Sequence, residues 1–232
     1  MGRLGMVSER SWWSWARRPL RRDSRSQGLD AMFSRRRILT AALVGSAGAV
    51  APVLARAAAP PAGPSSALMA RALSAFERHP GAFARDLIAI ADFDAASSVP
   101  RFHFVNLVSG GVTSLLVAHG RGSDPDHSGW VKRFSNAPGS AASSAGAYRT
   151  GPLYVGKHGP SRRIAGLDPT NSNAEPRAIV VHGAWYVSQD MVKEHGKLGR
   201  SEGCFAVAER ALPEVLARLG EGRLIYADRL HA

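Results

Sequence analysis

The chain has a single cysteine, Cys204, in 232 residues, which excludes an internal disulfide framework and a cysteine-rich zinc module. Acidic residues are also few, since 18 Asp and Glu stand against 30 Lys and Arg, giving a formal charge of +12. A hydrophobic content of 45% with 21% charged residues is typical of globular proteins, and it excludes a largely disordered chain and a polytopic membrane protein. The length suffices for one sizeable domain.

The positive charge is concentrated at the N-terminus. Residues 1–37 contain ten Arg and three acidic residues, whereas residues 60–232 carry a net charge of only +4. Residues 60–232 lack the runs of basic and aromatic residues that bind nucleic acid, so we expect no nucleic-acid partner. Its mild positive charge would still suit an acidic polymer.

The N-terminal segment has the features of an export signal. The sequence SRRRIL at residues 34–39 resembles the twin-arginine signal, and the apolar run 38–54 that follows is too short and weak for a membrane span of about 20 residues. Ala55 and Ala57 fit the A-x-A cleavage rule, so we expect cleavage after Ala57 or Ala58. The sequence therefore predicts a periplasmic or other extracytoplasmic protein that meets the membrane only through its signal segment, with an uncleaved anchor as the alternative.

The segment before this signal is unusual because three Trp interleave with several Arg over residues 12–22. Met32 is followed directly by the arginine cluster, as a normal start would be. We therefore expect Met32 to be the initiator, with a basic and aromatic membrane-surface segment as the alternative. The predicted organisation is an N-terminal extension and signal at 1–58, a linker and helix at 59–85, and the main domain at 86–232.

The main domain is predicted to be mainly β (α+β), built like a β-sandwich or barrel with a few short helices. Ser65 or Ser66 caps a first helix that ends at residues 79–81. Helices are also expected near residues 189–194 and over 212–219, and a long loop at 119–147. Short apolar runs predict strands at residues 87–91, 101–108, 112–118, 153–155, 163–167, 178–182 and 223–227.

Cys204 lies in a polar turn with two glycines, residues 199–204, that leads directly into an apolar segment. A free thiol with a pKa of about 8.5 is mostly protonated at neutral pH, so a nucleophilic cysteine needs a base or a positive neighbour. His182 is a candidate base at the end of an apolar run, and the carbonyl of Gly183 could fix its tautomer. From the residues alone, a nucleophilic thiol and a buried, inert thiol both remain open.

The pattern around these residues resembles a known family. His182-Gly183, a spacer reaching residue 200 and Ser201-x-Gly203-Cys204 are similar to the signature of YkuD-type L,D-transpeptidases, which have His, a spacer and then Ser/Thr-His-Gly-Cys. Glu202 stands where most of the family has the second His, and the spacer is long. Six segments resemble the murein L,D-transpeptidase catalytic-domain subgroup: residues 90–93, 117–123, 133–136, 143–148, 154–159 and 199–204.

The resemblance implies an exported cysteine L,D-transpeptidase that acts on peptidoglycan stem peptides without a cofactor or metal. In that family a thiolate attacks the stem carbonyl at position three, expels D-alanine, and passes the acyl group from a thioester to an amine of a second stem. Carried onto this chain, Cys204 is the nucleophile, His182 the base, and the carbonyl of Gly183 orients His182. Backbone N–H groups near Gly203 and Cys204 would stabilise the oxyanion, and Ser201 would brace the turn or His182.

Five further residues are candidates for substrate contacts: Arg200, His119, His158, Tyr154 and Trp185. The alternatives are a solvated Arg200, structural histidines in turns, and Trp185 as a core aromatic. The histidines could also bind zinc, but no H-x-x-E-H or equivalent spacing is present, so we expect no metal.

Three other functions remain as alternatives. With water as the acceptor, the same site would be an L,D-carboxypeptidase. A papain-like hydrolase is disfavoured because its cysteine precedes its histidine. A non-catalytic cell-wall-binding module would retain Cys204 as a structural residue, and Glu202 in the motif is its only support. The sequence leaves the oligomeric state open.

Overall fold

A mixed β-sheet dominates the structure, a computed structural model that describes residues 63–231. In this region nine strands pair in the order β3-β2-β1-β9-β5-β6-β7-β8-β4. The strands are β1 Leu87–Asp92, β2 Phe102–Asn106, β3 Val112–Leu115, β4 Val117–Ala118, β5 Gly146–Gly156, β6 Gly159–Gly166, β7 Val180–Ala184, β8 Phe205–Ala208 and β9 Leu224–Asp228. The α-helices are α1 Ser66–Arg78, α2 Gln189–His195 and α3 Leu212–Arg218.

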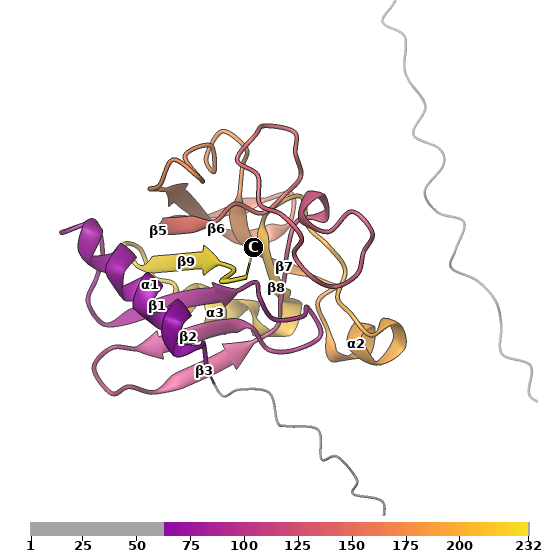
Figure 1. Cartoon of the computed structure of the whole chain (residues 1–232), viewed down its shortest axis with the longest axis horizontal. Helices are drawn as coiled ribbons and strands as arrows, with labels where there is room; N and C mark the ends of the chain where they lie inside the picture. Colours follow the sequence, from indigo (N-terminus) through magenta and orange to yellow (C-terminus); the bar gives the residue numbers. More distant parts are fainter. Residues whose placement is uncertain (1–62, 232) are drawn as a thin grey trace, which may run out of the picture. The chain divides into compact units, whose positions relative to one another are not determined.

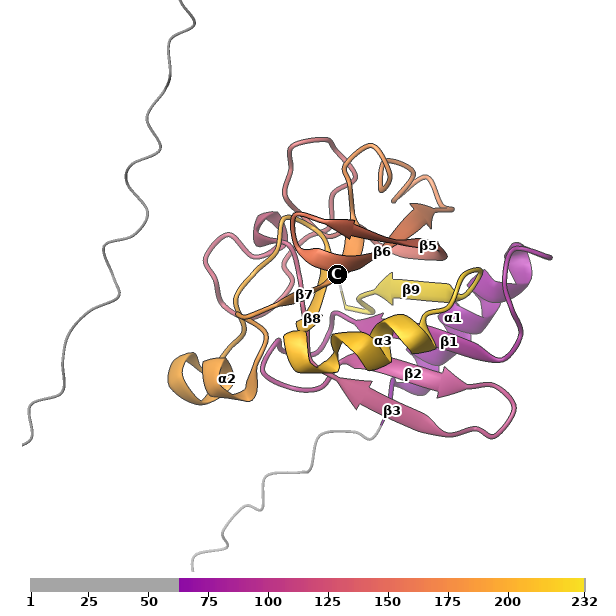
Figure 2. The same cartoon turned by 180° about the vertical axis from the view of Figure 1, so that it is seen from behind.

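The chain itself brings the two edges of this sheet together. β3 and β4 lie at opposite ends of the strand order, yet only Leu116 separates them in the sequence. The sheet must therefore curl until its edges approach each other. Figures 1 and 2 show the result: β5 and β6 lie above β9 and β1, with β7 and β8 at one side. The expected mainly β (α+β), barrel-like fold with a few short helices is confirmed.

Helices α1 and α3 cover opposite faces of β1 and β9 (Figures 1 and 2). Ile88 and Ile90 of β1 pack in a cluster with α1, whereas Ala89 and Ala91 belong to the main core together with side chains of α3. Both faces of this strand are therefore buried, which explains its continuous apolar sequence.

Phe205, the first residue of β8, lies at the centre of the main core. Its ring centroid lies 6.3 Å from that of Phe93, 6.1 Å from that of Phe102 and 5.3 Å from that of Tyr148. Its side chain is 1% exposed. Because Phe205 is anchored so firmly, the position of the preceding Cys204 is also restricted.

The predicted elements are found close to their expected places. Ser65 caps α1, since its Oγ accepts a hydrogen bond from the N–H of Leu68 at 3.2 Å. The run at 112–118 forms two strands on either side of Leu116 instead of one. The loop predicted at 119–147 has a 3-10 turn at Arg121–Ser123 and ends where β5 begins.

Three strands differ from the prediction. β6 begins at Gly159, four residues before the predicted segment 163–167. β5 begins seven residues before the predicted segment 153–155, because its first half pairs with β9 while its register with β6 shifts between Thr150 and Leu153. β8 was not among the predicted strands, since four residues give too short an apolar pattern to separate from the turn before it.

Among residues 63–231, no helix is both long and apolar enough to cross a bilayer. The predicted export signal, its cleavage site and the expected start at Met32 lie outside the described residues. They remain predictions from the sequence.

Candidate active site

The pairing of β7 with β8 brings His182 and Cys204 to one face of the sheet. The two strands are parallel, with Val181 opposite Phe205 and His182 opposite Ala206. Residues in register on parallel strands project to the same face, and Cys204 is two residues before Ala206, so its side chain shares the face of His182. Both residues line one pocket with a volume of about 530 Å³.

The turn before Cys204 is held by Ser201. The hydroxyl of Ser201 donates to the Cys204 carbonyl at 2.7 Å and accepts from the Gly203 N–H at 3.1 Å. The Ser201 N–H donates to the carbonyl of His119 at 2.9 Å, and the Ser201 carbonyl accepts from the N–H of Arg121 at 2.8 Å. Of the two roles predicted for Ser201, its bonds match the bracing of the turn.

Glycine is required at position 203. Its φ is +114°, a conformation that side chains disfavour, and a Cβ there would lie 2.6 Å from the carbonyl oxygen of Ala142. The Gly203 N–H is already used by Ser201, so it is committed to the turn. The stabilisation of an oxyanion that we expected from backbone N–H groups near Gly203 and Cys204 stays a prediction.

His182 is positioned as a neutral base. Its Nδ1 lies 2.9 Å from the carbonyl oxygen of Gly183, which can only accept, so the proton is assigned to Nδ1 and Nε2 remains basic. This contact is the one predicted for Gly183. The His182 ring is 2% exposed and stacks on His158, with centroids 4.2 Å apart. Burial lowers the pKa of His182 and outweighs the Gly183 hydrogen bond, which raises it, while His158 and Lys157 lower it further. The imidazole is therefore neutral at neutral pH.

The thiol of Cys204 is also neutral. Burial raises its pKa, although a backbone hydrogen bond from Val180 and the charges of Lys157 and Arg177 act in the opposite direction. The thiol contacts the carbonyl oxygen of Ala178 at 3.7 Å. A neutral thiol that shares a pocket with a neutral imidazole can become a nucleophile by passing its proton to the ring as it attacks.

Three of the five predicted substrate-contact residues line this pocket: Arg200, His158 and Tyr154. The other two do not. His119 is 1% exposed, and its ring lies between Arg101 at 2.7 Å and Asp124 at 3.3 Å. Burial, its largest cause, lowers the pKa of His119 to about 3. His119 is therefore a buried structural residue and does not contact the pocket.

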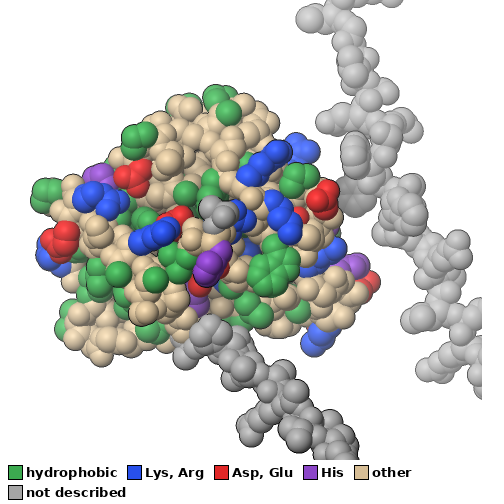
Figure 3. Space-filling model, in the orientation of Figure 1, with side chains coloured by type: hydrophobic (Ala, Val, Ile, Leu, Met, Phe, Trp, Pro, Cys, Tyr) green, Lys and Arg blue, Asp and Glu red, His purple; other side chains and the backbone are tan. Residues whose placement is uncertain are grey.

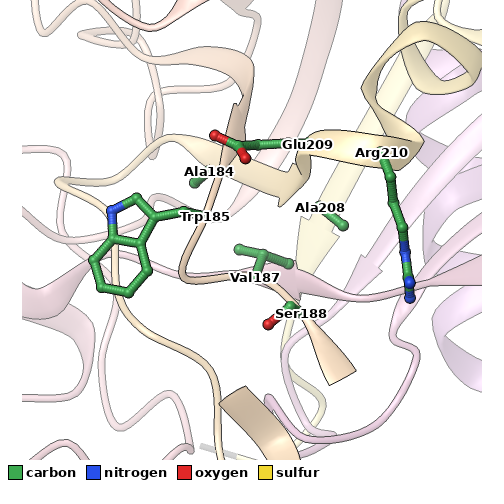
Figure 4. A pocket seen from close by; sticks show the side chains of 7 residues that line it. All are labelled: Ala184, Trp185, Val187, Ser188, Ala208, Glu209 and Arg210. Atoms are coloured by element: carbon green, nitrogen blue, oxygen red, sulfur yellow. The ribbon is translucent and has the colours of Figure 1, made fainter. Parts of the chain in front are cut away.

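Trp185 lies beside a different, smaller pocket of about 180 Å³. Figure 4 shows it with the other lining residues, Ala184, Val187, Ser188, Ala208, Glu209 and Arg210. The Trp185 side chain is 72% exposed, so it is not a core aromatic either. Its neighbour Tyr186 lines the larger pocket with Cys204. The chain leaves β7 at Ala184, and the two aromatic side chains then face different pockets.

Sequence reasoning missed Arg177 and Lys157 as pocket residues. Arg177 donates to the carbonyl of Ser135 at 2.9 Å and to Ser144 Oγ at 2.7 Å, which joins distant loops beside Cys204. No spacing relative to Cys204 marks these residues, because the curl of the sheet alone brings them together.

Glu202, which replaces the majority histidine, lies at the rim of the pocket. Its side chain is 68% exposed and pairs with Arg121 at 3.2 Å. Its charge raises the pKa of Cys204, a smaller effect than that of burial. Within the described part of the chain, no group of three or more His, Cys, Asp or Glu side chains could hold a metal ion.

Residues 65–227 match the family model described as the L,D-transpeptidase catalytic domain. No curated protein matches the sequence. The solved L,D-transpeptidase 1 of Mycobacterium tuberculosis is 12% identical over 61% of this chain and 61% of its own, with a TM-score of 0.35. An L,D-transpeptidase of Mycobacterium smegmatis is 13% identical over 62% and 58%, with a TM-score of 0.37.

A third solved structure, an L,D-transpeptidase in complex with imipenem, is 13% identical over 62% of this chain and 59% of its own, with a TM-score of 0.37. The chain thus spans about three fifths of the length of these solved proteins. The family assignment rests on the sequence match over residues 65–227.

The pH dependence of alkylation tests the neutral state of the thiol. Because burial raises the pKa of Cys204, its reaction with iodoacetamide should accelerate with pH through a midpoint above the value of about 8.5 for a free thiol. Mass spectrometry of the alkylated peptide gives the rate, and the protein unfolded in urea provides the reference. A rate that is high and constant from roughly pH 5 to 8 would show a preformed thiolate and contradict this account.

The turn geometry predicts unequal costs for two glycine substitutions. Gly203→Ala should lower the free energy of unfolding by about 3 kcal/mol, because it adds a clash with the Ala142 carbonyl to backbone strain. Gly139→Ala is the control, since φ is +75° but nothing lies within 4 Å of the new Cβ, and its cost should be about 1 kcal/mol. Urea unfolding measures both, and equal costs would disprove the tight packing around Gly203.

Proposed function

The chain belongs to the L,D-transpeptidase catalytic-domain family, and on this premise we propose that it is a cysteine L,D-transpeptidase that cross-links or remodels peptidoglycan stem peptides. The observation that carries the proposal is the shared pocket of Cys204 and His182 on one face of β7 and β8. The pocket places a thiol, a neutral imidazole and cationic side chains around one space.

In the first half-reaction Cys204 acts as the nucleophile. Its proton moves to Nε2 of His182 while Sγ forms a bond to the carbonyl carbon at stem position three. The N–H of Cys204 is the donor available in the turn for the oxyanion, a role typically worth about 3–4 kcal/mol. When the tetrahedral intermediate collapses, the bond to D-alanine breaks and the imidazolium returns the proton to the leaving amine. A thioester on Cys204 remains.

In the second half-reaction an amine of another stem attacks the thioester. Nε2 of His182 takes a proton from this amine, the new amide bond forms, and the bond to Sγ breaks. Lys157 and Arg177, whose charges lower the pKa of the thiol, favour the departing thiolate. The imidazolium then reprotonates Cys204, which restores the neutral pair.

The products formed from disaccharide tetrapeptide stems test this proposal. The protein should convert them to cross-linked dimers with release of D-alanine, as measured by mass spectrometry. Cys204→Ala should lower the rate at least about a thousandfold, because it removes the nucleophile. His182→Ala should also lower the rate strongly while leaving the pocket intact.

Other products would change the assignment. Tripeptide stems without dimers would indicate an L,D-carboxypeptidase that uses water as the acceptor at the same site. No product from the folded protein, or equal activity of Cys204→Ala, would contradict the proposed chemistry and favour a wall-binding module.

We also propose that the chain acts outside the cytoplasm after twin-arginine export. Residues 34–39 and the apolar run 38–54 support this, as does a substrate that lies in the cell wall. Replacing Arg35 and Arg36 together by Lys should retain the protein in the cytoplasm, because the charge stays while the guanidinium pair is lost.

Cell fractionation measures the outcome, and Arg56→Lys, near the expected cleavage site, is the matched control. Unchanged export of the Arg35→Lys, Arg36→Lys variant would disprove a twin-arginine signal.

A further inference from the structure

A second pocket adjoins the catalytic pocket and is lined by three arginines. Its volume is about 350 Å³, and Arg200 belongs to the lining of both pockets. The lining residues are Arg121, Gly122, Pro125, Arg133, Gly139, Ser140, Ala141 and Arg200, with no acidic residue among them. Figure 3 shows Lys and Arg side chains grouped on the side of this face where the loops between β4 and β5 lie in Figure 1.

The walls of this basic pocket are fixed by direct contact between two backbone segments. The N–H of Gly122 donates to the carbonyl of Ala141 at 2.9 Å, and a Cβ on Gly122 would lie 2.0 Å from the carbonyl oxygen of Ser140. The N–H of Ser143 also donates to Ser123 Oγ at 3.0 Å. The pocket is therefore preorganised and not a chance gap between mobile loops.

Each guanidinium is held by hydrogen bonds that do not use all of its donors. Nε of Arg133 donates to the carbonyl of Gly122 at 3.0 Å, and Nη1 of Arg200 donates to the carbonyls of Asp124 and Pro125. Nη2 of Arg121 donates to Glu202 at 3.2 Å. These bonds orient the planar groups, and five N–H donors per arginine leave capacity for a ligand.

The buried acid Asp124 forms no ion pair with these arginines. The Asp124 carboxylate is 0% exposed and accepts from the N–H and hydroxyl of Ser128 and from the N–H of Gly129. Its other close partner is His119, so the hydrogen-bond partners of this carboxylate in the described residues all lie outside the pocket lining. Glu202 is the one carboxylate paired with a lining arginine in the described residues, which leaves a net positive pocket.

We propose that this basic pocket binds a free carboxylate of a peptidoglycan stem peptide and so selects stems by their charge. The inference rests on the proposed function, because it assigns a subsite to the same reaction. Arginine matches the planar carboxylate with two parallel hydrogen bonds, and stem peptides carry carboxylates that amidation can neutralise. Since Arg200 borders both pockets, the bound carboxylate lies within a few residues of the carbonyl that Cys204 attacks.

Stems that differ only by amidation test the proposal. We compare kcat/KM for a tetrapeptide stem with all carboxyl groups free and for stems in which one carboxyl group at a time is amidated. Amidation of the recognised carboxyl should lower kcat/KM about tenfold, the loss expected for one charged hydrogen-bonded pair. Arg133→Gln should lower kcat/KM by a similar factor for the free stem and leave kcat/KM for the amidated stem unchanged.

Two versions of this experiment show whether the recognised carboxylate belongs to the donor stem or to the acceptor stem. Release of D-alanine without an acceptor measures the donor alone, and transfer from a fixed amidated donor to free or amidated acceptors measures the acceptor. Arg85→Gln is the matched control, because Arg85 is 70% exposed, pairs with Glu77 and does not line the pocket.

The proposal is overturned if amidation of neither the donor stem nor the acceptor stem changes kcat/KM. It is also overturned if Arg133→Gln lowers kcat/KM equally for free and amidated stems. Failure of the proposed function would look different, since the unaltered protein would then release no D-alanine from any stem.

Discussion

The buried guanidinium of Arg101 connects the closure of the sheet to the position of the thiol. Arg101 is 0% exposed and spans the seam at Leu116, since its N–H donates to the Leu115 carbonyl and its Nε to the Val117 carbonyl at 3.1 Å. Its Nη2 contacts His119 at 2.7 Å, and the His119 carbonyl in turn holds the N–H of Ser201. Burial lowers the pKa of Arg101 to about 9, so it stays charged at neutral pH. Because a buried charge without partners costs several kcal/mol, this network fixes the loop that supports the turn before Cys204.

The core and the loops of this fold have different roles at the site. The core fixes the backbone around the nucleophile through Phe205, while the loops between β4 and β5 supply charged groups around the pockets. A neutral thiol and a neutral imidazole suit the anionic ligand that we propose, because no permanent thiolate repels a carboxylate before attack. The surrounding cations then favour both the carboxylate and the transient thiolate. Glu202 moderates this positive field at the rim through its pair with Arg121.

The sequence predicts local features better than distant ones. Apolar runs such as 87–91, and the contact of His182 with the Gly183 carbonyl, depend on neighbouring residues and could be predicted. Arg177 could not, because its place beside Cys204 comes from the curl of the sheet. His119 was predicted at the substrate, yet it is buried by its contact with Arg101, a residue 18 positions away that no local pattern links to it. The apolar segment after Cys204 could be recognised, but its four residues did not suffice to place β8 in a predicted strand order.

The most direct test of the account is the intact mass of the protein mixed rapidly with a tetrapeptide stem in the absence of an acceptor amine. The account predicts a covalent adduct on Cys204 with the mass of the stem minus D-alanine, which disappears when an acceptor is added. Release of D-alanine with no adduct at any time would contradict the role of Cys204 as the nucleophile. An adduct that maps to another residue would contradict it as well.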